Sequence, residues 1–120
     1  MSTLLFVYGT LKRGCSNHHH LAGQTLVGMA RTPPGFTLYD LGGYPGIMPK
    51  PDDTNGVIGE VWSVDHETLQ RLDRFEGVHE GLYRREPFIL LPPFDGQIVQ
   101  AYISDLSVAG RREVGDCWVE

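Results

Sequence analysis

The sequence of 120 residues lacks the features that mark membrane and secreted proteins. No apolar run approaches the roughly 20 residues that a transmembrane helix needs. The first residues, 1–3, lead directly into an apolar segment, without the basic region and cleavage site of a signal peptide. Only two cysteines occur, Cys15 and Cys117, at opposite ends of the chain, and they give no disulfide framework. We therefore expect a cytoplasmic protein with free thiols and no membrane partner.

The sequence also lacks an excess of positive charge. Ten Lys and Arg residues against fifteen Asp and Glu residues give a formal net charge of −5. Proteins bind the phosphates of nucleic acids through a basic face, so we expect no nucleic-acid partner. Short basic pairs at 12–13, 84–85 and 111–112 are still suited to a small anionic substrate.

Length and composition are typical of one globular domain, and we assign residues 1–120 to a single domain. Apolar stretches between Gly/Pro turns predict strands at 4–7, 24–31, 36–41, 47–49, 57–64, 87–91 and 97–104. The Asn55-Gly56 pair predicts a hairpin into the strand at 57–64, whereas the segment after Asp105 has no clear pattern. Many short strands and few helices indicate an α+β protein with a barrel-like or strongly curved sheet.

The loop that leaves the first strand combines glycines with a sharp change of chemistry. The apolar run 4–7 stops at Tyr8-Gly9-Thr10, and a second glycine, Gly14, follows the basic pair at 12–13. Glycine lets a ligand approach the main chain closely, and successive backbone N–H groups can hold a carboxylate or an oxyanion. The alternative is an ordinary turn at the end of a strand. A phosphate-binding P-loop is excluded, because Cys15 stands where that motif needs lysine.

A helix is predicted from about His66 to Phe75, with Asp65 as its N-cap and Gly77 as its stop. On this helix Glu76 falls on the face that carries Leu69 and Leu72. A carboxyl group that points toward the core is costly unless it is paired or used, and desolvation raises its pKa. Glu76 is therefore a candidate general acid/base.

Two alternatives to a catalytic carboxylate stay open at this point. In the first, the helix frays at its end and the side chain of Glu76 points into solvent, or that side chain forms an ion pair with Arg84 or Arg85. Asp73 is the second candidate carboxylate, and Arg71 or Arg74 would neutralise it as a structural ion pair.

The run Cys15-Ser16-Asn17-His18-His19-His20 is the densest group of metal-ligand types. Zinc sites usually draw ligands from two separated segments or from one helical face, and this run has no second half. We favour a polar loop or the start of a helix here, and expect no metal. Cys15 paired with a neighbouring histidine as a nucleophile is a further alternative.

Taken together, five motifs resemble the gamma-glutamylcyclotransferase-like superfamily. They are Phe-Val-Tyr-Gly-Thr-Leu-Lys-Arg-Gly at 6–14, Tyr-Pro-Gly-Ile at 44–47, Gly-Glu-Val-Trp at 59–62, Leu-Asp-Arg-Phe-Glu-Gly at 72–77 and Leu-Tyr-Arg-Arg at 82–85. The likeness is greatest to the gamma-glutamylamine cyclotransferase branch. It implies a small β-barrel flanked by a few helices. Carried over by position, the catalytic glutamate of the family falls on Glu76 and its substrate-binding residues fall on Tyr8, Gly9, Thr10, Leu11 and Tyr83.

The resemblance also implies a reaction. The α-amino group of a gamma-glutamyl substrate attacks its own γ-carbonyl, giving 5-oxoproline and a free amine or amino acid. Glu76 moves the protons, and no metal or organic cofactor is needed.

Two other functions compete with this one. The first is a non-catalytic binding module for a gamma-glutamyl or other small anionic metabolite, which predicts affinity without turnover. The second is hydrolysis through Cys15 and a histidine of 18–20, which predicts inactivation by thiol alkylation.

Overall fold

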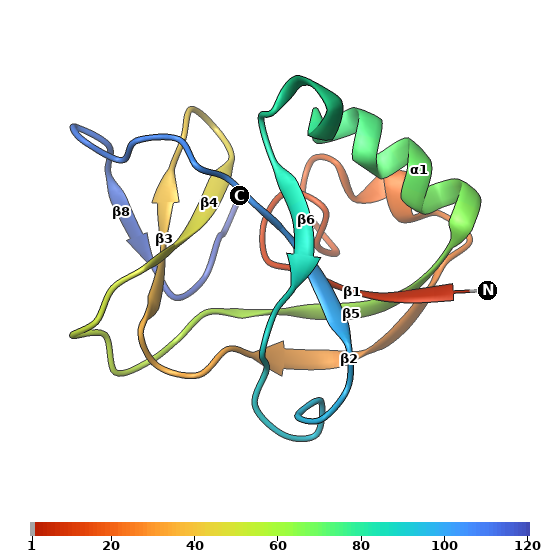
Figure 1. Cartoon of the computed structure of the whole chain (residues 1–120), viewed down its shortest axis with the longest axis horizontal. Coiled ribbons are helices and arrows are strands. Elements are labelled where there is room, and N and C mark those ends of the chain that lie inside the picture. The colour runs from red at the N-terminus through yellow and green to blue at the C-terminus, as the bar shows by residue number, and fades with distance from the viewer. Residues whose placement is uncertain (1) are drawn as a thin grey trace.

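The computed structural model describes residues 2–120 and arranges their strands in two sheets (Figure 1). The larger sheet has the order β2-β5-β1-β7-β6 and the smaller one the order β4-β3-β8. The strands are β1 (Ser2–Val7), β2 (Thr25–Arg31), β3 (Phe36–Asp40), β4 (Pro45–Pro49), β5 (Ile58–Asp65), β6 (Arg84–Pro87), β7 (Val99–Ile103) and β8 (Glu113–Gly115). The helices are α1 (His66–Phe75) and the 3-10 turns η1 (His18–Leu21) and η2 (Val78–Glu80).

The centre of the larger sheet is the antiparallel pair β1 and β5. Their register runs from Ser2 opposite Asp65 to Val7 opposite Glu60. The strand β7 pairs with the other side of β1 in parallel orientation. The second half of β1 and most of β5 are buried, because their apolar side chains alternate between the two faces of the sheet and both faces are covered there. The C-terminal end of β1 therefore delivers the loop 8–14 from a rigid part of the core.

The sequence predicted α1 with the bounds that the structure shows. The Asp65 carboxylate accepts a hydrogen bond from the Thr68 backbone N–H at 2.8 Å, and the helix buries Leu69 and Leu72. The chain leaves the helix through Gly77, which has a φ of 68° that favours glycine. Figure 1 shows α1 lying over β1 and β5, away from the small sheet. Neither α1 nor any other helix among residues 2–120 has the length and apolar character to cross a membrane.

The α+β class is confirmed, but the small barrel is not. The strands among residues 2–120 form the two sheets just described, and neither sheet closes on itself. The hairpin predicted at Asn55-Gly56 is also wrong, because β4 pairs with β3 and β5 pairs with β1 and β2. This turn carries the chain from the small sheet to the large one.

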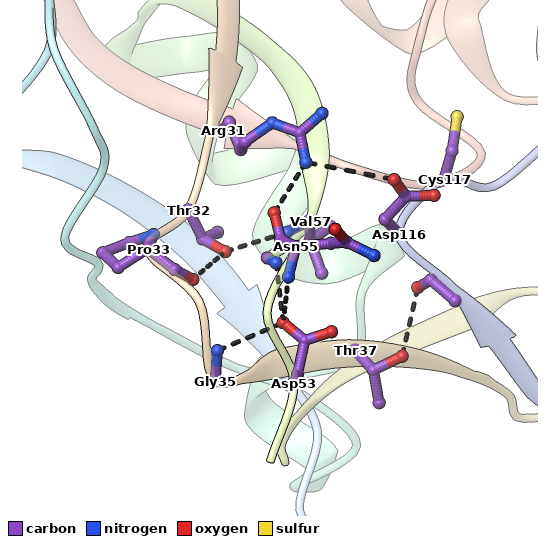
Figure 2. A network of polar contacts seen from close by, with 12 residues as sticks. Arg31, Thr32, Pro33, Gly35, Thr37, Asp53, Asn55, Val57, Asp116 and Cys117 are labelled. Atoms are coloured by element: carbon purple, nitrogen blue, oxygen red, sulfur yellow. Dashed lines mark hydrogen bonds and ion pairs between the residues drawn. The ribbon is translucent and has the colours of Figure 1, made fainter. Parts of the chain in front are cut away.

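A network of hydrogen bonds explains the path of that turn (Figure 2). The Asp53 carboxylate accepts hydrogen bonds from the backbone N–H groups of Gly35 at 3.1 Å and Gly56 at 2.6 Å. The Thr32 hydroxyl accepts one from the Val57 N–H at 2.9 Å. These contacts hold the turn against the segment between β2 and β3. The chain then continues into β5 and does not fold back on β4.

Near the C-terminus, one predicted strand differs from the structure and one observed strand was not predicted. The predicted strand at 87–91 is wrong, because the paired strand is β6 and ends at Pro87, which lacks an N–H. The strand predicted at 97–104 is confirmed as β7. The strand β8 was not predicted, since three residues that pair with β3 leave little pattern in the sequence.

Candidate functional site

A pocket of about 300 Å³ opens where the loop after β1 meets the end of α1. It is lined by all six positions that the resemblance carried over: Tyr8, Gly9, Thr10, Leu11, Glu76 and Tyr83. The first four come from one loop, Glu76 follows α1, and Tyr83 follows η2. The structure therefore brings residues from three separate segments to one cavity.

Glu76 is the only acidic residue that lines this pocket among the described residues. Its backbone N–H donates to the Leu72 carbonyl at 2.8 Å, which extends the last turn of α1. Its carboxyl group has no hydrogen bond or ion pair within residues 2–120. Burial raises the pKa of Glu76 from 4.5 to about 7. A carboxyl group with such a pKa can both accept and donate a proton near neutral pH.

Two tyrosines, the buried Tyr8 and the partly buried Tyr83, line the pocket with Glu76. The Tyr8 hydroxyl donates to the Tyr102 carbonyl, and the Tyr83 hydroxyl donates to the Pro45 carbonyl at 2.9 Å. Burial, together with the negative charge of Glu76, raises the pKa of both phenols, so they stay neutral. Each ring thus has its hydroxyl fixed by the main chain, and the pair forms a rigid wall of the pocket.

The loop 9–11 leaves its backbone donors unused. Within residues 2–120, the N–H groups of Gly9, Thr10 and Leu11 donate to no protein acceptor. The loop is held instead through its acceptors, because the Lys12 N–H donates to the Gly9 carbonyl at 3.1 Å and the Asn17 N–H to the Thr10 carbonyl at 2.9 Å. Such a loop offers several donors to an anion at once.

Close packing fixes the position of Gly9. A Cβ atom at this residue would lie 2.6 Å from Cγ of Pro45, closer than side chains approach one another. Glycine is therefore needed here for the approach of the loop to β4 rather than for an unusual φ.

A buried carboxylate holds the far side of the loop. Glu60 accepts hydrogen bonds from the Arg13 N–H at 3.1 Å, from Arg13 Nε at 3.0 Å and from Trp62 Nε1 at 3.0 Å. Burial alone would raise the pKa of Glu60, but the bonds from Trp62 and Arg13 lower it overall. This charged contact ties the loop to β5.

Asp73, the second candidate carboxylate, is paired elsewhere. Its partner is Arg85, at 2.8 Å and 3.0 Å for the two N···O contacts, and not Arg71 or Arg74 as the sequence suggested. The Tyr102 hydroxyl donates to the same carboxylate at 2.7 Å. Burial would raise the pKa of Asp73, yet these hydrogen bonds lower it. Asp73 stays ionised and fixes Tyr102 in the wall of the pocket.

The Cys15–His20 segment is engaged in packing. His18 Nδ1 lies 2.9 Å from the Leu11 carbonyl, and the ring centres of His20 and Phe75 are 4.3 Å apart. Residues 2–120 contain no group of three or more His, Cys, Asp or Glu that would hold a metal ion. Burial raises the pKa of Cys15, which is the opposite of what an activated thiolate needs.

Sequence reasoning missed several residues of the pocket. Asn17 lines it and donates from Nδ2 to the Thr10 hydroxyl at 3.0 Å. Further lining residues are Tyr44, Phe75, Leu82, Tyr102 and Leu106. Tyr44, Phe75 and Leu82 lie within the motifs at 44–47, 72–77 and 82–85 but had no predicted role in the site. The others lie outside these motifs, and the fold brings all of them to one pocket.

Comparison with known proteins gives consistent matches. A model of the family described as "Gamma-glutamyl cyclotransferase, AIG2-like" matches residues 5–119. A Vibrio cholerae protein provisionally assigned as a gamma-glutamylcyclotransferase is 46% identical over 86 residues, 72% of this chain and 71% of that protein. Gamma-glutamylaminecyclotransferase A of Danio rerio is 36% identical over 88 residues, 68% of this chain but only 54% of the fish protein.

Solved structures show the same fold. A mouse AIG2-like protein has a TM-score of 0.72 at 30% identity, covering 87% of this chain and 78% of the mouse chain. Escherichia coli YtfP has a TM-score of 0.69 at 30% identity, covering 97% of this chain and 95% of its own.

Proposed function

Because the chain belongs to the gamma-glutamyl cyclotransferase, AIG2-like family, we propose that it converts a gamma-glutamyl amine or amino acid to 5-oxoproline and the free amine. The observation that carries the proposal is Glu76, an unpaired carboxyl group with a pKa of about 7 in a pocket beside three free backbone donors. The proposal treats the chain as one catalytic domain, since the lining residues extend from Phe6 to Leu106.

The first step is attack by the substrate's own α-amino nitrogen. Ionised Glu76 takes a proton from the α-ammonium group, and the freed nitrogen forms a bond to the γ-carbonyl carbon. The carbonyl oxygen becomes an oxyanion, which the N–H groups of the loop 9–11 are suited to stabilise. Ring closure is unimolecular, so the main task of the pocket walls is to hold the folded conformer.

The second step breaks the γ-amide bond. The tetrahedral intermediate collapses, the C–N bond to the leaving amine breaks, and Glu76 returns its proton to that nitrogen. The ring nitrogen, which carries one proton more than the lactam product, releases that proton to solvent. No electrons are exchanged with another reagent, and the proposed reaction uses no metal or organic cofactor. Glu76 ends in the ionised state in which it began, ready for another cycle.

The test is release of 5-oxoproline from gamma-glutamyl-ε-lysine, gamma-glutamyl-alanine and glutathione. The variant Glu76→Gln keeps the volume of the side chain and removes the base, so we expect turnover to be lost while substrate binding is retained. Glu80→Gln is the matched control, because Glu80 is exposed and does not line the pocket.

Two results would overturn the proposal. Unchanged turnover in Glu76→Gln would refute the role of this residue. Binding of the substrates by the unmodified chain without any turnover would favour the non-catalytic binding module.

A further inference from the structure

A second cavity, of about 380 Å³, adjoins the pocket described above at Phe75, which lines both. It lies where η1 packs against α1. Four of its seven lining residues are basic, and they come from both elements: His19, His20, Arg71 and Arg74. No acidic residue lines the cavity in the described part of the chain. We call these four side chains the basic cluster.

The arginines of the basic cluster have little compensating negative charge. The Arg74 side chain has no hydrogen bond or ion pair within residues 2–120. Arg71 pairs with Glu67 at 3.2 Å, but both side chains are exposed, and such surface pairs contribute little stability. Arg74 stands in the last turn of α1, where the negative end of the helix dipole favours a cation. That position accounts for one of the four basic residues and leaves the other three unexplained.

The two histidines face the arginines across the cavity opening. The ring centre of His20 lies 4.3 Å from that of His19 and 4.3 Å from that of Phe75. Burial, followed by the positive charges of His19 and Arg71, lowers the pKa of His20. The groups around His20 are thus His19 on η1 and the two arginines on α1, and the acid of that helix, Glu67, is paired with Arg71. A proton on His20 is unfavourable here unless an anion enters the cavity.

We propose that the basic cluster binds a small tetrahedral dianion of the phosphate or sulfate type. The guanidinium groups of Arg71 and Arg74 match the oxygens of such an anion with paired N–H donors. Protonated His19 and His20 add donors from η1. The chain as a whole has a net charge of −5, so general attraction does not hold anions on it, and binding depends on the convergence of these four side chains. This inference does not rest on the cyclotransferase reaction.

The experiment is a calorimetric titration of the protein with sulfate, which stays a dianion over the range in which histidine titrates. Chloride keeps the ionic strength constant, because salt screens exposed charges. We expect millimolar binding at about pH 6 and binding at least about three-fold weaker at about pH 8, where the histidines are neutral. In parallel, NMR titration of the His20 ring should show that sulfate raises its pKa.

Variants identify the site. Arg74→Gln should weaken sulfate binding at least about five-fold, because it removes a charged donor. Arg112→Gln is the matched control: it removes the same charge from an exposed arginine that does not line the cavity, and it should bind sulfate as the unmodified chain does. Replacing both histidines, His19→Gln with His20→Gln, should remove the difference between the two pH values.

Three results would overturn the inference. The first is a titration without saturable heat in which sulfate also leaves the pKa of His20 unchanged. The second is an equal loss of binding in Arg74→Gln and Arg112→Gln, because binding would then follow net charge instead of the cavity. The third is binding in the double histidine variant that still depends on pH. Since no substrate is present, each of these results leaves the proposed reaction standing, and absence of 5-oxoproline release would leave the anion site standing.

Discussion

Replacing Glu76 by glutamine should stabilise the protein at neutral and alkaline pH. The side chain is held in a site that disfavours its charge, and no cation within residues 2–120 compensates for that cost. Glutamine has nearly the same volume and stays neutral. The substitution that removes the proposed base therefore also removes an unfavourable, partly buried charge.

The magnitude follows from the pKa of Glu76 in the folded protein, about 7, against 4.5 for an ordinary glutamate. This difference corresponds to about 3 kcal/mol of unfolding free energy. Below pH 4.5 the carboxyl group is neutral in both the folded and the unfolded state, so it does not lower the stability of the protein. As the pH rises from 4.5 to 7 the unfolded chain ionises first and the protein loses stability, and above pH 7 the loss is complete.

The assay is urea unfolding of both chains at a series of pH values. The free energy of unfolding of Glu76→Gln minus that of the unmodified chain should rise across pH 4.5 to 7 and then level off. Other titrating groups cancel in this difference. Glu80→Gln should stay within about 0.5 kcal/mol of the unmodified chain at every pH. A difference for Glu76→Gln that does not change with pH would refute the reasoning.

Two further predictions concern activity. The acidic limb of kcat/KM for 5-oxoproline release should have its midpoint near pH 7, because the proposed base must be ionised, and a midpoint near 4.5 in a pH–rate profile would contradict this role. Gly9→Ala should lower kcat/KM at least about ten-fold, because its methyl group would collide with Pro45 and displace the loop. Gly28→Ala is its control, since the added methyl would meet only Phe94 at an ordinary 3.5 Å, and equal activity of the two variants would show that the approach of the loop is not needed.

The sequence predicted well those parts of the fold whose neighbouring residues carry a clear pattern of caps, apolar positions and glycines. The helix α1 has a cap, an apolar face and a glycine stop, so its bounds follow from neighbouring residues. The same periodicity put Glu76 on the face of Leu69 and Leu72, and in the structure this residue lines the pocket.

What the sequence did not predict depends on contacts over long separations. The partner of Asp73 is Arg85, twelve residues later, and its second donor, Tyr102, is 29 residues away. The partners that the sequence suggested, Arg71 and Arg74, stand two residues before and one after Asp73, and helix positions with those spacings do not face one another. Helix geometry alone was therefore enough to question that pairing, but not to find the true one.

The path of the chain between the sheets was missed for a similar reason. An Asn-Gly pair favours a two-residue hairpin through its own backbone preferences. Here the Asp53 carboxylate accepts hydrogen bonds from the N–H groups of both Gly35 and Gly56, which ties the turn to the segment between β2 and β3. A contact between residues 18 positions apart thus overrides a local preference, and the chain passes from the small sheet to the large one at this turn.

The distribution of charge around α1 explains how a carboxyl group with a pKa of about 7 persists beside several arginines. Asp73 and Glu76 lie three residues apart, on adjacent turns of one face. Asp73 accepts from Arg85 at two atoms and from Tyr102 at one, so this arginine of β6 is already engaged in an ion pair. With that arginine engaged, burial acts on Glu76 without an opposing ion pair, and its pKa stays raised. Of these two neighbouring carboxyl groups, Asp73 thus has the ion pair with Arg85 and Glu76 has the raised pKa that the proposed proton chemistry needs.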